Sequence, residues 1–293
     1  RNRNARKSVN KAKKNGKITA LKADIIADTG AYPSAGEAVI LRSVLFSSGP
    51  YEIPNADVNG CCVYTNTTPA GAMRGFGSNQ PAVASEIIMD MLAEKLAMDP
   101  IELRLLNALD VGKQTIGGQV LTSSVGIKQT LIEVQKALQN EKIPELNDYL
   151  IGVGIASAMK NVGLGSGMND CAGATAEIQG EHILLRVASV DSGQGSDTVV
   201  RQVASEVLHV PAFSIELIAN DTAQTIDGGV TTASRQTFVT GNAVKIASEA
   251  LKKSILEKSA SALGLNFSEV DFVNSLVVSR ATNEPLLTCQ EVF

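Results

Sequence analysis

The sequence predicts an α+β (mixed α/β) protein made of two related subdomains, each with a sheet and long helices. Short runs of alternating apolar and polar residues, typical of half-buried strands, are interspersed with longer runs that have helical spacing. Both halves of the chain repeat the order of strand, glycine-rich loop and helix, which indicates two similar units. The pattern breaks at residues 140–144, Asn-Glu-Lys-Ile-Pro. We therefore expect a first domain at 1–145 and a second at 146–293.

The first half opens with a predicted strand pair. Eight basic residues and no acid precede Leu21, and the hairpin-turn dipeptide Asn15-Gly16 leads into an alternating strand at Ile18–Ala27. A basic start also occurs in transit peptides and nucleic-acid-binding arms, but the alternation that follows favours a solvated strand pair. Gly60–Thr67 is a further strand candidate. Because the chain begins with Arg1 rather than Met, we expect a piece of a longer polypeptide.

Three helices are predicted in the first half. Apolar residues recur at helical spacing through Asn79–Met98, which indicates an amphipathic helix. Asp99 is a typical N-cap residue and Pro100 a typical first helical residue, so a short helix is expected to follow, ending at Leu109. Ser124–Gln139 carries its apolar residues on one helical face and is the third predicted helix.

The second half is predicted to repeat this organisation with more strands. Its elements, in order, are a strand at Leu150–Met159, a hairpin of Ala172–Ile178 and Ile183–Val190 turning at Gly180, a helix at Ser196–His209, a strand at Phe213–Ala219 and a long helix at about Ala233–Leu263.

The composition excludes several classes of protein. The chain has 293 residues, 44% hydrophobic, with a net charge of −4, and no apolar run approaches the length of a membrane span. Trp is absent and only 4% of residues are aromatic, which argues against a nucleic-acid-binding surface. Four cysteines without a C-x-x-C spacing and two histidines argue against a zinc site, a cysteine-ligated iron–sulfur cluster or a catalytic triad. Few, unpatterned cysteines favour a cytoplasmic location.

Four glycine-rich loops are the candidate binding elements. In the first, at residues 69–80, Arg74 and Phe76 alternate with glycines, and Ser78 or Asn79 is expected to cap the following helix. The other three lie at 163–167, 191–196 and 228–234. Three of the four precede a predicted helix, where backbone N–H groups suit a phosphate or a polar ring. None has the P-loop or Gly-x-Gly-x-x-Gly pattern. The alternative for each loop is a simple turn; together they predict a large polar cofactor.

The order of these motifs resembles a known family. Arg-Gly-Phe-Gly at 74–77, Gly-Gln-Gly at 193–195 and Thr-Ala-Ser at 232–234 occur in the order seen in the molybdopterin-binding part of xanthine dehydrogenase and aldehyde oxidase. The similarity extends through nearly the whole chain and includes Asp-Pro-Ile-Glu-Leu-Arg at 99–104. It implies that both predicted domains are molybdopterin-binding subdomains, the second truncated at its C-terminus.

The resemblance implies a molybdenum hydroxylase. In that family a molybdenum-bound hydroxide attacks an electron-poor carbon and a hydride moves to the molybdenum sulfido ligand. The implied cofactor is molybdopterin with molybdenum, and the implied partners are iron–sulfur and FAD domains or subunits in a homo-oligomeric parent. The implied substrate is a small heterocycle, a purine or a related N-heterocycle. The alternatives are an aldehyde-oxidising relative, a non-catalytic cofactor-binding or assembly domain, and a fragment that has lost its cofactor.

The resemblance also implies a role for each site residue. Arg42 would orient the substrate and Phe76 would stack on its ring; the alternative for Arg42 is a surface helix arginine. The backbone at Arg74 would approach the molybdenum ligands. The remaining cofactor-binding residues implied are Gly75, Gly193, Gln194, Gly195, Thr232, Ala233 and Ser234.

The chain departs from the family pattern at several places, and the loop at 73–76 lacks the cysteine that carbon monoxide dehydrogenases carry there. Gly163-Leu164-Gly165 stands where a second substrate-stacking aromatic residue is expected. The catalytic glutamate of the family lies beyond Phe293, so we expect this chain to be inactive as isolated. Five internal acids are expected to be surface or structural groups rather than substitutes for that base: Glu37, Glu86, Glu177, Glu206 and Glu216.

Overall fold

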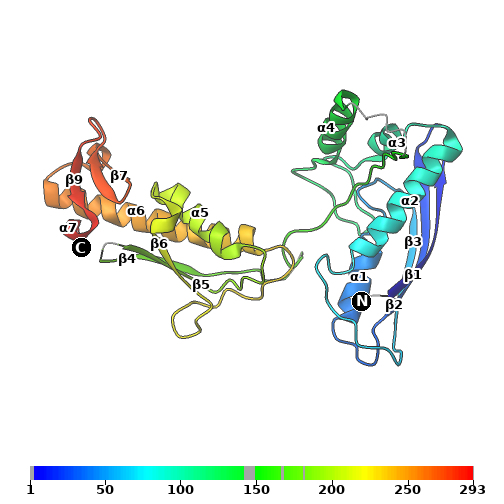
Figure 1. Cartoon of the computed structure of the whole chain (residues 1–293), viewed down its shortest axis with the longest axis horizontal. Helices are drawn as coiled ribbons and strands as arrows, with labels where there is room; N and C mark the ends of the chain where they lie inside the picture. Colours follow the sequence, from blue (N-terminus) through cyan, green and yellow to red (C-terminus); the bar gives the residue numbers. More distant parts are fainter. Residues whose placement is uncertain (1–2, 142–148, 166–167, 181, 293) are drawn as a thin grey trace. The chain divides into compact units, whose positions relative to one another are not determined.

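The computed structural model describes residues 3–141, 149–165, 168–180 and 182–292. The chain divides into two compact units, Arg1–Lys160 and Asn161–Phe293. The predicted division at 145/146 lies outside the described residues and stays a prediction. The combination of helices and sheets confirms the predicted α+β class (Figure 1).

The first unit contains one sheet and four helices among its described residues. In chain order its elements are β1 (Arg3–Ala12), β2 (Ile18–Asp28), α1 (Gly36–Leu45), β3 (Ala56–Val63), α2 (Asn79–Leu96), α3 (Pro100–Asn107) and α4 (Ile127–Asn140).

The sheet of the first unit has the strand order β1-β2-β3. β1 and β2 form an antiparallel hairpin, and Gly16 supplies the positive φ angle (+86°) that the turn requires. β3 pairs with β2 in parallel after the crossover through α1. Alternate side chains of β2 are buried from Leu21 to Ala27, as the sequence predicts. The main hydrophobic core of the first unit includes Ile18, Leu21, Ala23, Tyr51, Ile53, Met89, Ala93 and Leu103.

The second unit contains two three-stranded sheets among its described residues. Its elements are β4 (Ala174–Gln179), β5 (His182–Val187), α5 (Ser196–Leu208), η1 (Ala212–Ser214), β6 (Ile215–Ala219), η2 (Gln236–Thr240), α6 (Gly241–Leu263), η3 (Phe267–Glu269), β7 (Val270–Val273), β8 (Leu276–Ser279), β9 (Pro285–Thr288) and α7 (Cys289–Val292).

The first sheet of the second unit repeats the topology of the first unit. β4 and β5 form an antiparallel hairpin, and β6 pairs with β5 in parallel after the crossover through α5. Both units therefore contain a hairpin–helix–strand motif. The second sheet, β7-β8-β9, is antiparallel throughout.

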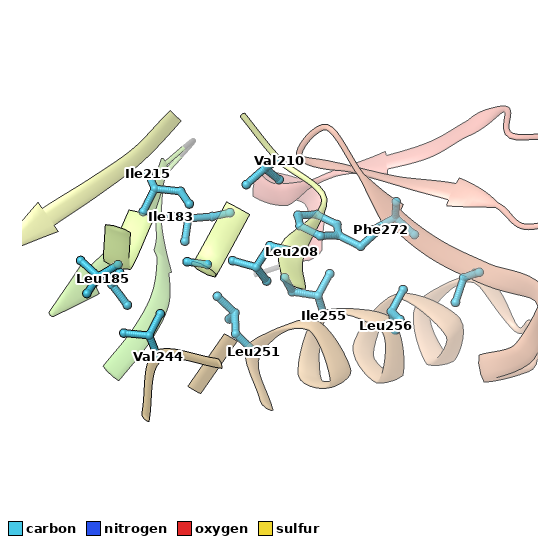
Figure 2. Close-up of a cluster of buried hydrophobic side chains, with 14 of the residues drawn as sticks. Ile183, Leu185, Leu208, Val210, Ile215, Val244, Leu251, Ile255, Leu256 and Phe272 are labelled. Atoms are coloured by element: carbon cyan, nitrogen blue, oxygen red, sulfur yellow. The ribbon is translucent and has the colours of Figure 1, made fainter. Parts of the chain in front are cut away.

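The core of the second unit lies between its strands and the two helices α5 and α6 (Figure 2). Leu185 of β5, Leu208 of α5, Ile255 of α6 and Phe272 of β7 are fully buried. Burying one such side chain contributes about 1.5–3 kcal/mol, so this cluster fixes α5 and α6 on the sheet. The loops that precede α5 and α6 are positioned by the same core.

The predicted strand at Leu150–Met159 is wrong: this segment has no regular secondary structure. Its backbone groups bond to buried side chains instead of a neighbouring strand. The carbonyl of Ile155 accepts from Arg104 at 3.0 Å, and the N–H of Ser157 donates to Glu86 at 2.8 Å. The segment therefore packs as an extended linker on α2 and α3.

Several other predicted boundaries also shift. The strand expected at Gly60–Thr67 begins at Ala56 and ends at Val63, because its partner β2 ends opposite Val63. The helix expected from Ser124 begins at Ile127. The long helix expected from Ala233 begins with the π-helical turn η2 at Gln236.

Candidate functional site

The Arg-Gly-Phe-Gly loop at 74–77 packs closely against α1. Gly77 has a φ angle of +88°, in the left-handed region that favours glycine. A Cβ on Gly77 would lie 2.2 Å from the carbonyl oxygen of Val39, so a side chain there would collide with the helix backbone. The Ser43 hydroxyl donates to the Gly77 carbonyl at 2.7 Å. These contacts bring the loop to the part of α1 that contains Arg42.

Ser78 and Asn79, which the sequence predicts as caps of α2, instead hold the conformation of this loop. The prediction that Ser78 or Asn79 caps α2 is wrong, because neither side chain accepts from a helix N–H group. The Ser78 hydroxyl donates to the Gly75 carbonyl at 2.6 Å, and Asn79 Nδ2 donates to the Arg74 carbonyl at 3.0 Å. Phe76 is held at a φ of +48°, which is strained for a bulky residue. Phe76 is half-buried and Arg74 is exposed.

Arg42 lies in the last turn of α1 with a second cation nearby. Its side chain is half-buried, and its carbonyl accepts from the Phe46 N–H at 3.0 Å. Lys160 Nζ stands 5.7 Å from the centroid of the Phe46 ring, in cation–π range. Burial, and then the charge of Arg42, lower the pKa of Lys160 below its ordinary value. Two positive charges therefore lie near one another at the C-terminal end of α1.

A buried ion pair supports this part of the first unit. Arg104 Nε donates to Glu86 Oε2 at 2.9 Å, and the two side chains are 0% and 6% exposed. The Tyr51 hydroxyl donates to Glu86 Oε1 at 2.7 Å. Burial, and then the charge of Glu86, raise the pKa of Tyr51 well above its ordinary value. Glu86 is thus a structural acid. The other four acids considered with it are exposed: Glu37, Glu177, Glu206 and Glu216.

The Gly-Gln-Gly loop of the second unit follows β5 and precedes α5. Gly193 and Gly195 have φ angles of +97° and +83°, and a Cβ on either would meet no atom within 4 Å. The Asp191 carboxylate accepts from the N–H groups of Gly193 at 2.7 Å and Gly195 at 3.3 Å. These backbone donors, Gly193 first, lower the pKa of Asp191. The Gln194 amide also bonds within its own loop. The N–H groups expected to face a ligand are therefore bonded to Asp191.

Arg235 organises the neighbouring loops of the second unit. Its guanidinium is 1% exposed and pairs through Nε with Asp170. Nη1 donates to the carbonyls of Gly228 at 2.7 Å and Val230 at 3.0 Å, and Nη2 donates to the carbonyl of Cys171. One buried cation thus joins two loops that are distant in the sequence.

The Thr-Ala-Ser segment directly before Arg235 is strained. Ala233 and Ser234 are consecutive non-glycine residues with φ angles of +51° and +56°. Such a conformation costs on the order of 1–3 kcal/mol for each residue, and it persists only where the surroundings fix it. The Ala233 carbonyl accepts from the Gly163 N–H at 2.9 Å. Thr232 and Ser234 are exposed, so the segment presents strained backbone to its surroundings.

The structure brings the predicted site residues together in two groups. Arg42 and the loop at 74–77 adjoin in the first unit. In the second unit Thr231 Oγ1 accepts from the Val190 N–H at 3.1 Å, which joins the loop at 190–196 to that at 228–236. The two groups belong to different units. Residues 166–167 of the loop predicted at 163–167 lie outside the described residues.

Reasoning from the sequence did not single out Asp191, Arg235 or Lys160. Asp191 opens the Gly-Gln-Gly loop and Arg235 follows Thr-Ala-Ser directly, so a charged residue at the edge of each loop could have indicated the first two. Lys160 carries no local signal, because its neighbours Arg42 and Phe46 are distant in the sequence. No group of three or more His, Cys, Asp or Glu residues that could hold a metal ion occurs in the part of the chain that the structure describes.

Family models decide the relationship of the chain to known proteins. Two models, both described as a molybdopterin cofactor-binding domain, match residues 8–108 and 129–293. The chain belongs to the molybdopterin cofactor-binding domain family. The resemblance inferred from the sequence is therefore confirmed, and molybdopterin is the cofactor class of both matched segments.

Named relatives in the same family are molybdenum oxidoreductases. The solved aldehyde oxidoreductase of Desulfovibrio gigas is 32% identical, with a TM-score of 0.75, and the match covers 87% of this chain and 29% of that one. The nicotinate dehydrogenase large molybdopterin subunit of Eubacterium barkeri is 46% identical over 47% of this chain and 31% of the relative. A probable xanthine dehydrogenase subunit of Bacillus subtilis is 35% identical over 78% of this chain and 31% of the relative. The chain thus spans less than a third of each relative.

Of the helices formed by the described ranges, none is both long enough and apolar enough to cross a membrane.

Proposed function

We propose that this chain holds the molybdenum cofactor and part of the substrate site of a hydroxylase whose whole protein oxidises a purine or a related N-heterocycle. Family membership supports the cofactor. The contact of α1 with the loop at 74–77, made by Ser43 and Gly77, carries the substrate class. It sets Arg42, a hydrogen-bond donor, and Phe76, an aromatic ring, on adjoining segments. A planar heterocycle with polar ring atoms suits that pair.

Unpartnered buried atoms beside the loops support the fit of a polar cofactor. Ser189 Oγ and Asp197 Oδ1 flank the Gly-Gln-Gly loop, and Gln80 Oε1 follows the loop at 74–77; all three are buried without a hydrogen-bond partner among the described residues. An unpaired buried polar atom costs about 1–3 kcal/mol. A pterin has N–H groups and ring acceptors that could complete these sites. The open space at Gly193 and Gly195 also admits a close ligand.

Two adjoining loops of the second unit would hold the cofactor. Thr232, Ala233 and Ser234 would bind it through exposed hydroxyls and strained backbone. Gly193, Gln194 and Gly195 would contribute the open space beside the two glycines, because their polar groups are bonded within their own loop. When bound, the cofactor supplies the two-electron oxidation chemistry that the side chains of this chain lack.

The residues of the chain itself would orient the substrate. The Arg42 guanidinium would donate to a substrate oxygen or ring nitrogen and stabilise negative charge that develops there. Phe76 would stack on the ring. We also propose that the parent protein is a cytoplasmic homo-oligomer, and that its partners are iron–sulfur and FAD domains or subunits.

Oxidation of an aldehyde is the second candidate. It is favoured by the aldehyde oxidoreductase relative, and by Gly163-Leu164-Gly165, which supplies no second aromatic ring for a heterocycle.

The test uses the parent protein that contains this chain. Molybdenum and released pterin are measured per mole of protein, followed by turnover of xanthine and of a small aldehyde. Arg42→Met should lower kcat/KM for xanthine about 100-fold or more, as expected for loss of a charge-stabilising donor, with a much smaller loss for the aldehyde. The exposed Arg280→Met serves as control. Equal losses on both substrates would refute the orienting role, and absence of pterin would refute cofactor binding.

A further inference from the structure

We propose that Arg235 and Asp170 are positioning residues for cofactor binding, and that this buried pair holds the Thr-Ala-Ser segment in a conformation ready for the cofactor before the cofactor binds. The inference rests on the proposed function, because it concerns how the cofactor of that function is received. It assigns roles to two residues to which the sequence motifs and the family match give none.

Arg235 is placed to act through the backbone rather than on a ligand. Its side chain is 1% exposed, and an arginine has five N–H donors. Nε donates to the Asp170 carboxylate and Nη2 to the carbonyl of Cys171. Nη1 donates to the carbonyls of Gly228 at 2.7 Å and Val230 at 3.0 Å. Because four donors are thus used inside the protein, the influence of the guanidinium passes through the loops that it joins.

Asp170 attaches the opposite loop to the same pair. One of its carboxylate oxygens accepts from Arg235, and the other accepts from the Leu164 N–H at 2.8 Å. In the same loop the Gly163 N–H donates to the carbonyl of Ala233 at 2.9 Å. The pair therefore joins both loops, and one connection reaches the Thr-Ala-Ser segment itself.

The segment fixed by these contacts has a conformation that is costly without support. Ala233 and Ser234 have φ angles of +51° and +56°, which are unfavourable for residues with a side chain. Neither of their N–H groups donates to an acceptor among the described residues. Successive backbone N–H groups in such a turn form a concavity that suits an anionic or polar ligand group. Relaxation of the two residues to negative φ would withdraw these donors.

The first experiment follows amide hydrogen exchange by NMR in the 293-residue chain without cofactor. Arg235→Lys keeps the charge next to Asp170, but an ammonium group cannot replace a fork that reaches the carbonyls of two loops. The exchange of the Gly163 and Leu164 amides should become about tenfold faster or more, because their protection depends on the pair. The amide of Leu185, within β5, is the internal control and should not change.

The second experiment measures how firmly the parent protein retains its pterin. Pterin per mole of protein is determined at intervals during dialysis. Arg235→Lys should release it about tenfold faster or more, since a tenfold change corresponds to a small part of the strain that the pair supports. Leu256→Ala, a truncation in the core on α6, is the matched control. It should lower the melting temperature at least as much and still retain the pterin.

A second substitution separates positioning from general stability. Glycine adopts positive φ without strain, so Ala233→Gly should make the required conformation accessible with fewer supporting bonds. The double variant Ala233→Gly/Arg235→Lys should therefore release pterin more slowly than Arg235→Lys alone. In Leu256→Ala the same glycine should leave the release rate unchanged.

The possible failures have different meanings. Unchanged exchange at Gly163 and Leu164 in Arg235→Lys would refute the claim that the pair fixes the loops. Equal pterin release by wild type and Arg235→Lys, equal release by Arg235→Lys and Leu256→Ala, or no rescue by Ala233→Gly would refute the positioning role and leave the proposed function standing. A wild-type parent without pterin would refute the proposed function, and the positioning role with it. A parent that holds pterin but oxidises only aldehydes would refute the proposed substrate class alone.

Discussion

Replacing Glu86 by alanine should destabilise the first unit by about 3–5 kcal/mol, the usual cost of removing one partner of a buried ion pair. The Glu86 carboxylate accepts three hydrogen bonds, from Tyr51 at 2.7 Å, Ser157 at 2.8 Å and Arg104 at 2.9 Å. Neutral donors contribute about 0.5–1.5 kcal/mol each and a charged donor about 1.5–3, which brackets the same range. Arg104 would keep its bond to Asp90 at 2.8 Å, so the upper limit is not expected.

The glutamine variant separates charge from hydrogen bonding. In Glu86→Gln the amide oxygen can face Arg104 and Ser157, while the Tyr51 hydroxyl turns to accept from the amide N–H. All three contacts then survive and only the charge is lost, so the expected cost is about 1–2 kcal/mol. Glu94→Ala, at an exposed position on the same helix, is the matched control and should stay within about 0.5 kcal/mol.

The chain provides a selective probe for this measurement. It has no Trp, and its four tyrosines all lie in the first unit: Tyr32, Tyr51, Tyr64 and Tyr149. Tyrosine fluorescence during urea unfolding therefore reports on the first unit alone. A loss below 1 kcal/mol for Glu86→Ala, or equal losses for the alanine and glutamine variants, would refute the role given to the buried charge.

Two other predictions concern the loops. Gly77→Ala should lower the free energy of unfolding of the first unit by about 2 kcal/mol or more, because strain at positive φ adds to a collision with the α1 backbone. Gly112→Ala is the control: its φ is +83°, but the added Cβ would have no atom within 4 Å, so it should cost only about 1 kcal/mol. Similar losses for both variants would mean that the close approach to α1 is unimportant. The lowered pKa of Asp191 predicts stability that is present above the ordinary carboxyl range near pH 4 and is lost as the pH falls further, since the unfolded chain takes up the proton first. Asp191→Asn should flatten this acid dependence of the melting temperature, and an unchanged acid limb would contradict the assignment.

Local patterns predicted most of the regular structure. The alternation of β2, the hairpin at Asn15-Gly16 and the start of α3 all depend on residues close together in the chain. Asp99 does cap α3, accepting from the N–H groups of Ile101 at 2.8 Å and Glu102 at 3.0 Å. The segment at 150–159 was mispredicted because its hydrogen-bonding partners lie far away in the sequence, on α2 and α3.

In the candidate site, too, local motifs were predictable and distant contacts were not. The loop motifs were visible as glycine-rich stretches with a chemical pattern, and their family membership is confirmed. The sequence could not show which hydrogen bonds each polar group makes. Asp191 accepts from N–H groups of its own loop, and Ser78 and Asn79 donate to backbone carbonyls. Lys160 reaches the end of α1 only through tertiary packing, so no local pattern could place it beside Arg42. The roles of the individual site residues remain predictions.

The buried pair of Glu86 and Arg104 also determines where this protein can be cut. Ile155 and Ser157 belong to no helix or strand, yet they supply a carbonyl and an N–H group to the two charges. A recombinant piece ending at residue 145 would keep each helix and strand that the structure describes in the first unit, from β1 to α4, and still lack these partners. A piece ending after Lys160 would retain them. For excision of the first unit, or for interpreting a proteolytic fragment, the linker is therefore part of the folded body.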